Sequence, residues 1–298
     1  MKIITSNEIE ALNISPLESV EWVRNAFLMK DRCQLPPKIS LHPQGTDFFN
    51  TMPSLLPEEY HTFGCKVVSR IRGSEPALKS ELMLFDTLTG EMTALMNADW
   101  ITARRTGAVA ALAIDTLQST KAEIYAFVGL GVIARATLDC LLAMTSHREI
   151  SIRLKKYKDH CDRIIKEYDH FKNVHFEVVE TMDELVVGAD VVVSCITDAD
   201  GLLVNDTKLF KPGVLVVPVH TRGFQNCDLV FDKVFADDTA HVKGFKYFNQ
   251  FRKFEELPSV LKEQTKGREN DEERILSYNI GISLHDVYYG YRICQLCE

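Results

Sequence analysis

A glycine-rich turn carries the clearest chemical signature in the sequence. It has the spacing G-x-G-x-x-A and separates an apolar run at 124–128 from a stretch with helical periodicity. In such a turn, the glycines allow a sharp bend and a close approach to a pyrophosphate, and the helix N–H groups attract phosphate. An ordinary turn without a ligand gives the same pattern, but the flanking strand and helix favour a dinucleotide site. Its residues are Gly129, Gly131, Val132, Ile133 and Ala134.

The end of the next predicted strand bears on which dinucleotide is bound. An acid about 20 residues beyond the turn would accept the ribose hydroxyls of NAD. Here the segment 153–158 reads R-L-K-K-Y-K; it contains no acid, and the next acid along the chain is Asp159. Lys155 and Lys156 would suit the 2′-phosphate of NADP, although a solvated charge run also produces this pattern. The sequence therefore favours NADP and keeps NAD as the alternative.

Two adjacent arginines, Arg104 and Arg105, lie near the start of an alanine-rich helix predicted at 98–118. Cations in the first turn of a helix oppose its macrodipole, so this placement costs stability and points to a function. Neighbours on a helix lie about 100° apart, so only one of the two can easily face inward. We expect that arginine to bind an anion and the other to lie at the surface.

Three further residues could bind an anion or transfer a proton. Lys66 lies inside an apolar strand predicted at 63–69, and Lys38 begins a short extended piece; neither lysine indicates a role on its own. His220 follows a strand predicted at 214–219, at the strand end where open α/β sheets bind ligands. It could donate or accept a proton near neutral pH. A buried, hydrogen-bonded histidine is an equally good interpretation.

The first hundred residues predict a mostly antiparallel sheet with a flanking helix. The helix covers 6–30, with Ser6 as its cap and a possible break at Ser15-Pro16. The region 36–57 is rich in proline and turn residues and offers only short extended pieces. Three strands follow, the last two joined by a hairpin turn at Thr89-Gly90: 63–69, 81–86 and 92–96.

From Lys121 onward, strands and helices alternate, which is typical of a doubly wound α/β domain. A capping box at 181–184 opens one short helix, and a last helix at 280–294 is expected to pack back toward the first domain. We therefore predict a Rossmann-like parallel sheet at 119–274 and an N-terminal α+β domain made of 1–118 with 275–298. The parallel strands of the Rossmann-like domain are expected at 124–128, 149–154, 174–179, 191–195 and 214–219.

Composition restricts the class of protein. The 298 residues are 46% hydrophobic and 26% charged, as in a soluble globular protein, and the net charge of −8 argues against a nucleic-acid surface. Without a membrane-length apolar run or a secretion signal, we expect a cytoplasmic protein that binds no membrane. The eight scattered cysteines are expected to be free thiols. No metal is expected, because the acids and histidine at 237–241 match no metal-binding spacing.

The segment TGEMTALMNADWITARRTGAVAALA, followed by FVGLGVIA, resembles the ornithine cyclodeaminase/mu-crystallin family. That family also includes archaeal-type alanine dehydrogenases and cyclic imine reductases. The resemblance covers nearly the whole chain, and its specific part is the arginine–threonine helix before the glycine turn. It extends through 52–53, 64–66, 211–213, 266–268, 279–281 and 284–286. It implies a homodimer in which the first domain binds substrate and dimerises.

The resemblance also implies roles for individual residues. Arg105 would hold a substrate carboxylate together with Lys66, and Lys38 stands where the family often has an arginine with the same task. A guanidinium binds a carboxylate through two hydrogen bonds, whereas a lysine acts as a point charge. Arg105 would also contact the cofactor, as would Thr106 and Thr197.

One departure separates this chain from the cyclodeaminases of the family. They carry an aspartate just after the last parallel strand, where this chain reads V-P-V-H-T-R-G at 217–223. Cyclodeamination needs a base that manages the substrate amines, so the missing acid argues against that reaction. The sequence predicts an NAD(P)-dependent oxidoreductase that transfers hydride at the Cα of a small amino or imino acid, with Lys66 or His220 handling the proton. A cyclodeaminase with bound NAD and a non-catalytic NADPH-binding protein are the alternatives.

The sequence also bears on the charge of the substrate. Arg70 and Arg72, close to Lys66 in sequence, would suit a second anionic group on the substrate. An exposed strand explains the two arginines equally well.

Overall fold

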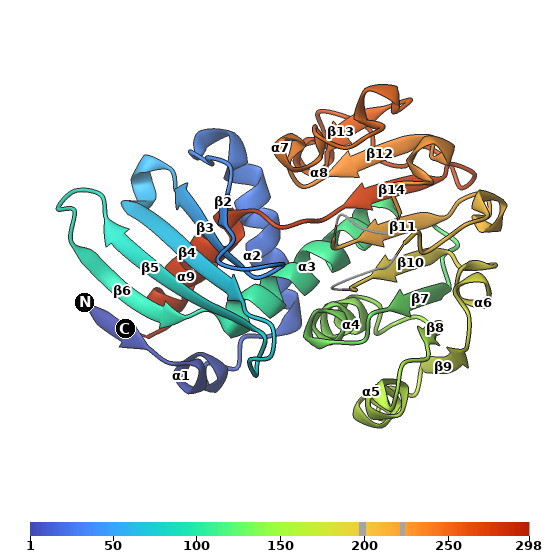
Figure 1. The fold of residues 1–298 in the computed structure, drawn as a ribbon, viewed down its shortest axis with the longest axis horizontal. Coiled ribbons are helices and arrows are strands. Elements are labelled where there is room, and N and C mark those ends of the chain that lie inside the picture. The colour runs from blue at the N-terminus through green and yellow to red at the C-terminus, as the bar shows by residue number, and fades with distance from the viewer. Residues whose placement is uncertain (197–200, 221–223, 298) are drawn as a thin grey trace. The chain divides into compact units, whose positions relative to one another are not determined.

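The computed structural model describes residues 1–196, 201–220 and 224–297 (Figure 1). The chain divides into two compact units, Met1–Arg105 with Ile282–Glu298 and Thr106–Gly281. Among the described helices, none is long and apolar enough to cross a bilayer. The predicted cofactor residue Thr197 and the segment 221–223 lie outside the described residues.

The first unit is built on a six-stranded sheet in the order β1-β6-β5-β4-β3-β2. These strands are β1 (Lys2–Ile4), β2 (Ile39–Leu41), β3 (Phe48–Leu55), β4 (Thr62–Arg70), β5 (Leu78–Asp86) and β6 (Met92–Asn97). The three predicted strands are β4, β5 and β6, and the pairing of β5 with β6 confirms the hairpin. The sequence does not predict β1, which pairs parallel to β6, or β3, in which Pro53 masks the strand pattern.

Three helices accompany this sheet: α1 (Ser6–Ala11), α2 (Pro16–Met29) and α9 (Ser283–Leu296), with 3₁₀ turns at Lys30–Arg32 and Glu58–Tyr60. The single helix predicted at 6–30 is therefore two helices, and the break falls at Ser15-Pro16. The Ser15 side chain caps α2, and Pro16 occupies its first position. The prediction that Ser6 caps the first helix is wrong, because Thr5 and Glu8 form a complete capping box there.

Helix α9 packs against one face of this sheet, as predicted for the last helix. Two glycines permit the close approach. A Cβ on Gly64 would lie 2.7 Å from Val287 Cγ2, and a Cβ on Gly290 would lie 2.5 Å from Leu82 Cδ2. Because side chains alternate along β4, Lys66 points to the same face as Gly64 and is buried there. This packing carries a lysine into the core of the first unit.

The second unit contains a parallel sheet of eight strands in the order β13-β12-β14-β11-β10-β7-β8-β9. They are β7 (Ile124–Val128), β8 (Ile150–Lys155), β9 (Val174–Val179), β10 (Val191–Ser194), β11 (Leu215–Pro218), β12 (Lys233–Ala236), β13 (Phe254–Glu256) and β14 (Ile275–Tyr278). The five predicted strands are β7 to β11, and every residue of β10 and β11 is buried. The prediction placed the whole of 275–298 in the first domain. Strand β14 instead pairs with β11 and β12 and is therefore part of the parallel sheet.

Helix α3 (Asp99–Leu117) contains the boundary between the two units. The helices that follow it in the second unit are α4 (Val132–Met144), α5 (His160–Tyr168), α6 (Met182–Val186), α7 (Thr239–Val242) and α8 (Leu257–Leu261). Short 3₁₀ turns lie at Thr207–Leu209, Asp228–Val230 and Phe248–Gln250. Thr181 and Glu184 form the predicted capping box of α6. The sequence predicts no elements between Phe235 and Ile280, where α7, β13, α8 and β14 have only three to five residues each. Elements this short carry too little periodicity to be recognised.

Strand β7 lies between β8 and β10, at the point where the strand order reverses. In open α/β sheets, ligands bind outside the carboxyl ends of the strands at this switch point. The glycine turn directly follows β7 and therefore lies at the position where such a sheet binds its ligand.

Gly107 sets how closely α3 approaches α4. A Cβ at this position would lie 2.4 Å from the backbone carbon of Ala136 and 2.5 Å from the nitrogen of Thr137. Alanine forms helix better than glycine by about 1 kcal/mol, but here the two backbones would have to separate. We expect Gly107→Ala to lower the free energy of unfolding in urea by about 1–3 kcal/mol. Gly244→Ala, whose Cβ would meet no atom within 4 Å, is the control; equal midpoints for the two variants would contradict this packing.

Candidate functional site

Lys66, Arg105 and Asp286 form a buried ionic cluster in the first unit. The Lys66 Nζ lies 2.8 Å from Asp286 Oδ1, and the Arg105 Nε lies 2.9 Å from the same oxygen. Lys66 and Asp286 are fully buried, and only 5% of Arg105 is exposed. Lys66 also donates to the Thr102 hydroxyl at 3.3 Å. One carboxylate oxygen thus joins two cations that come from distant parts of the chain.

Three elements bring these side chains together. Lys66 lies on the face of β4 that α9 covers, and Asp286 lies in the first turn of α9, where the helix macrodipole favours an acid. Arg105 is the inward-facing one of the two adjacent arginines, and Arg104 lies over the Trp100 ring at 5.6 Å. Because α3 begins at Asp99, both arginines lie in its second turn and oppose the macrodipole less than the predicted first-turn position implies.

Burial and neighbouring charges shift the protonation equilibria of the cluster. Burial first, and then the charge of Arg105, lowers the pKa of Lys66 to about 8, while Asp286 acts in the opposite direction. Burial by itself would raise the pKa of Asp286, but the charges of Arg105 and Lys66 outweigh it and lower that pKa. Asp286 is therefore ionised at neutral pH. Exposed Lys38 adds a smaller lowering of the Lys66 pKa, so its charge acts on the same cluster.

The cluster is electrostatically incomplete. Lys66 and Arg105 bring two positive charges to a single carboxylate, and a buried net charge is unfavourable without a counter-ion. Two buried atoms of the cluster also have no hydrogen-bond partner among the described residues: Arg105 Nη1, which is a donor, and Asp286 Oδ2, which is an acceptor. A ligand with an anionic group and an N–H group would satisfy both atoms. An amino acid, or an imino acid in its protonated iminium form, carries a carboxylate and an N–H group on the same α-carbon.

Asp286 is the member of the cluster that the sequence prediction misses. The sequence feature that could have identified it is the position of an acid between Leu284 and Val287 in the buried part of α9, because a buried charged side chain needs a partner. Helical periodicity does not identify that partner, because Lys66 is 220 positions away in the chain.

The glycine turn of the second unit has two glycines that are present for different reasons. Gly129 has φ +82°, and a Cβ there would lie 2.5 Å from the backbone of Cys195 and Ile196, so the protein itself requires glycine. Gly131 has φ −88°, and a Cβ would meet no atom within 4 Å. The fold does not require glycine at position 131, whereas a pyrophosphate lying on this backbone would.

The N-terminus of α4 completes the turn. The helix has no capping side chain and no acid in its first turn, so the N–H groups of Val132, Ile133 and Ala134 present a partial positive charge. Ala134 is fully buried, and Val132 is 68% exposed. These features, together with the space at Gly131, fit the pyrophosphate of a dinucleotide.

The cations predicted to favour NADP lie at the end of β8. Lys155 donates to the carbonyl oxygen of Lys156 at 3.2 Å, and Lys156 pairs with exposed Glu180 at 2.5 Å. An exposed ion pair of this kind is weak, so Lys156 can exchange its partner for a phosphate. His160, which the sequence analysis does not select, approaches the glycine turn, with its Nδ1 lying 3.3 Å from the Leu130 carbonyl oxygen.

His220 lies at the carboxyl end of β11 in the second unit. Its Nε2 forms a hydrogen bond with the Ser194 hydroxyl at the end of β10, and its ring lies 6.1 Å from that of Phe224. These contacts hold the imidazole at the sheet edge where ligands bind.

Arg72, predicted to suit a second anionic group, has partners within the protein. Arg72 donates through its side chain to Thr46 and through its backbone to Asp47. All eight cysteines lie in the described residues and none forms a disulfide, as predicted. In the part of the chain that the structure describes, no group of three or more His, Cys, Asp and Glu side chains could hold a metal ion.

Comparison with known proteins establishes the family. Residues 1–293 match the model of the ornithine cyclodeaminase/mu-crystallin family. This chain belongs to that family. The predicted membership is therefore confirmed.

Two curated relatives cover most of the chain. It is 27% identical over 299 residues to the nodulation efficiency protein NfeD of Rhizobium meliloti, covering 97% of this chain and 90% of that protein. It is 26% identical over 259 residues to a Δ1-pyrroline-2-carboxylate reductase of Bacillus thuringiensis subsp. konkukian, covering 79% of this chain and 77% of that protein. Relatives in the family thus include a reductase of a cyclic imino acid.

Two solved structures share the fold over nearly their whole length. Thermococcus litoralis Δ1-pyrroline-2-carboxylate reductase, in complex with NADH and L-proline, has a TM-score of 0.87 and 22% identity, covering 100% of this chain and 97% of that chain. An archaeal alanine dehydrogenase dimer with bound NAD has a TM-score of 0.84 and 22% identity, covering 99% and 95%. The predicted fold class is therefore confirmed.

Buried Lys66 generates a pH dependence of stability. Its pKa is about 8 in the folded protein against an ordinary value of 10.5. Between these values the unfolded chain keeps a proton that the folded protein has released, so the free energy of unfolding rises with pH. We expect Lys66→Met to lose this rise in denaturant titrations, and Lys79→Met, which removes an exposed lysine, to keep it. The same pH dependence in Lys66→Met and the unaltered protein would contradict the shift.

Proposed function

We propose that this protein is an NAD(P)-dependent oxidoreductase that transfers hydride at the Cα of a small amino or imino acid. The buried cluster of Lys66, Arg105 and Asp286 carries the proposal, because it combines surplus positive charge with one donor and one acceptor that lack protein partners. The first unit would bind the substrate, and the second unit would bind the nucleotide.

The cluster would recognise each polar group of the substrate separately. Arg105 would donate through Nη1 to the carboxylate, and the charges of Lys66 and Lys38 would add to this attraction. Asp286 Oδ2 would accept a hydrogen bond from the substrate N–H. A simple carboxylic acid lacks that N–H group and would leave Asp286 unsatisfied, so the cluster favours α-amino and α-imino acids over other carboxylates.

Lys66 would handle the proton. In reduction of an imine, hydride adds to Cα, the electron pair of the C=N bond moves to nitrogen, and the Lys66 ammonium group gives that nitrogen a proton. Because the pKa of Lys66 is about 8, its neutral form is accessible near neutral pH, and amine oxidation can use the same lysine in reverse. His220 is the second candidate for this step, although its Nε2 is engaged with Ser194.

The nucleotide would lie on the glycine turn. When bound, it supplies the hydride at nicotinamide C4. Gly129 would shape the turn, Gly131 would leave room for the pyrophosphate, and the first N–H groups of α4 would bind its oxygens. Arg105, Thr106 and Thr197 would contribute further cofactor contacts. Lys155 and Lys156 would favour a 2′-phosphate, which places NADP before NAD.

The segment at the end of β11 and directly after it supports redox chemistry over cyclodeamination. The described residues Pro218, Val219 and His220 contain no carboxylate that could manage the amines of a diamino acid. An imidazole bound to Ser194 offers a different charge to an ammonium group. This difference makes the lyase reaction the less favoured alternative.

The outer face of the first-unit sheet supports a homodimer. A row of paired residues crosses five strands on the face opposite Lys66: Ile3, Leu95, Met83, Cys65 and Pro53. All five are exposed or half-buried, and exposed Ile39, Leu41 and Phe49 extend the apolar surface on β2 and β3. An apolar surface of this kind marks a protein interface. We propose a second copy as its occupant, in keeping with the dimeric alanine dehydrogenase.

The activity can be tested by following oxidation of NADPH and NADH with cyclic imino acids and with 2-oxo acids plus ammonia. We expect turnover with one of these classes. Arg105→Gln should lower kcat/KM by about 100-fold, because it removes a charge-assisted carboxylate contact. Lys66→Met should lower kcat by about 100-fold or more, as expected for loss of an acid–base group. Arg104→Gln, at the neighbouring surface position, should leave both constants nearly unchanged.

Several outcomes would contradict this function. Consumption of ornithine with release of ammonia and proline, at constant nicotinamide absorbance, would establish the lyase instead. Tight NADPH binding without product from any substrate would indicate a binding protein. Loss of turnover in His220→Ala, together with an active Lys66→Met, would move the proton role from Lys66 to His220.

The dimer can be tested with one substitution in the centre of the apolar row. Met83→Glu would bury an unpaired charge twice across a symmetric interface, so we expect the dimer dissociation constant to rise by at least about 100-fold. Light scattering after gel filtration would measure this change. Leu17→Glu, at an exposed apolar position on α2, is the control and should stay dimeric. A monomeric unaltered protein, or a dimeric Met83→Glu, would exclude this interface.

A further inference from the structure

A chain of three hydrogen bonds leads away from buried Lys66 within the first unit. Lys66 Nζ donates to Thr102 Oγ1 at 3.3 Å, Thr102 Oγ1 lies 3.0 Å from Ser80 Oγ, and Ser80 Oγ donates to Asp99 Oδ1 at 3.0 Å. Lys66 and Ser80 have 0% and 1% of their surface exposed, and Thr102 has 9%. Two buried hydroxyls thus connect a buried amine to a half-exposed carboxylate.

The direction of each bond in this chain is consistent with the others. A lysine ammonium group only donates, and an ionised aspartate only accepts. The bond between the two hydroxyls must therefore run from Thr102 to Ser80, so that along this chain each hydroxyl accepts from one neighbour and donates to the next. Such an arrangement lets a proton move by short hops, without the movement of any heavy atom.

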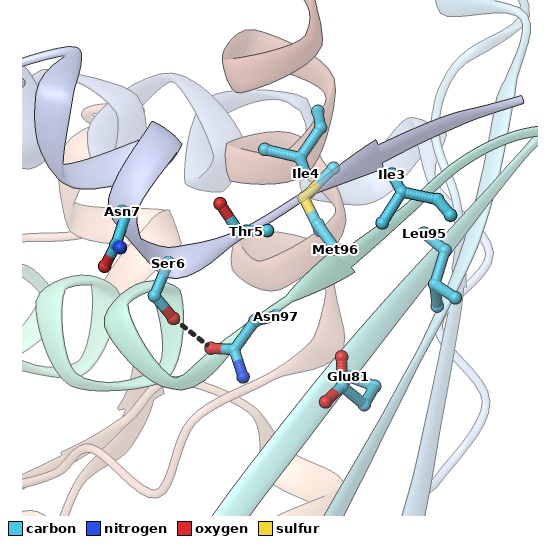
Figure 2. A pocket seen from close by; sticks show the side chains of 9 residues that line it. All are labelled: Ile3, Ile4, Thr5, Ser6, Asn7, Glu81, Leu95, Met96 and Asn97. Atoms are coloured by element: carbon cyan, nitrogen blue, oxygen red, sulfur yellow. Dashed lines mark hydrogen bonds between the residues drawn. The ribbon is translucent and has the colours of Figure 1, made fainter.

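A hollow of about 400 Å³ on the first unit is lined by Glu81 and Asn97, two residues close to the outer end of the chain. Figure 2 shows Glu81 and Asn97 among its lining side chains, with Ser6 donating a hydrogen bond to Asn97. The Asp99 N–H donates to Asn97 Oδ1, which places Asp99 beside the hollow. Burial, with the nearby charge of Asp99, raises the pKa of Glu81. A carboxyl group that holds its proton more readily thus lies next to the end of the chain.

A purely structural link does not require both hydroxyls. The Ser80 backbone N–H already donates to Asp99 Oδ1 at 2.6 Å, so β5 and the start of α3 are joined without the Ser80 side chain. The hydroxyls add a continuous path between two ionisable groups, one buried and one in contact with water.

We propose, on the basis of the function proposed above, that Thr102 and Ser80 relay protons between Lys66 and Asp99, with Glu81 beside the outer end. After Lys66 has given its proton to the substrate nitrogen, the hydroxyls rotate. Thr102 then gives its proton to the neutral amine, Ser80 gives its proton to Thr102, and protonated Asp99 gives its proton to Ser80. Asp99 takes this proton from water beforehand and is ionised again after the transfer. No electrons are transferred in these steps, and each hydroxyl ends with the proton count with which it began.

The relay can be tested with Ser80→Ala and Thr102→Val, which remove one hydroxyl each at nearly constant volume. Reduction of the best substrate from the screen above should show a burst of one nicotinamide oxidised per site, because Lys66 starts protonated. Later turnovers should slow by about tenfold or more, as general acid–base catalysis depends on recharging that group. Thr102→Ser restores the hydroxyl and should recover most of the rate that Thr102→Val loses. KM should change little.

The outcomes separate the relay from the function on which it depends. Steady-state rates like that of the unaltered protein in both hydroxyl variants, with Lys66→Met inactive, would overturn the relay alone. An equal loss of the burst and of later turnover would indicate a structural role and also overturn it. An active Lys66→Met, or an unaltered protein without turnover, would overturn the proposed function and the relay together. If Thr102→Val fails to fold by circular dichroism, Ser80→Ala decides the matter.

Discussion

The shared carboxylate of Asp286 is the interaction on which the candidate site depends. Lys66 and Arg105 repel each other, and burial lowers the pKa of Lys66, so the two cations need this acid to lie side by side in the core. Its position fixes how β4, α3 and α9 meet, and Gly64 and Gly290 supply the close contact that lets α9 reach the sheet. A single ionic contact thus explains both a packing feature and a site.

Among the described residues, this cluster has one hydrogen-bond donor and one acceptor without partners, and it has one more positive charge than negative charges. Protein cores normally satisfy their buried polar atoms, and exceptions gather where a ligand completes the set. The unsatisfied atoms of Arg105 and Asp286 match the carboxylate and the N–H group of an amino or imino acid. The hydroxyls of Thr102 and Ser80 give this buried site a connection to surface protons.

The candidate nucleotide site of the second unit depends on backbone geometry, whereas the candidate substrate site of the first unit depends on charge. Gly129 is required by its own conformation and by the neighbouring strand end, whereas Gly131 is required only by what would lie on it. The glycine pattern alone suits many turns. The strand order makes it specific, since β7 lies between β8 and β10 at the reversal of the sheet.

The sequence by itself determined the features whose causes lie within a few residues of each other. The capping box at Thr181, the apolar run of β7 and the expectation that only one of Arg104 and Arg105 faces inward follow from local hydrogen bonding, burial and helical periodicity. Only the tertiary structure decided which charges meet. Asp286 pairs with Lys66, which is 220 positions away in the sequence, and β14 joins the parallel sheet by pairing with β11 and β12. Such contacts leave no local pattern, because their energy exists only after separate segments have packed together.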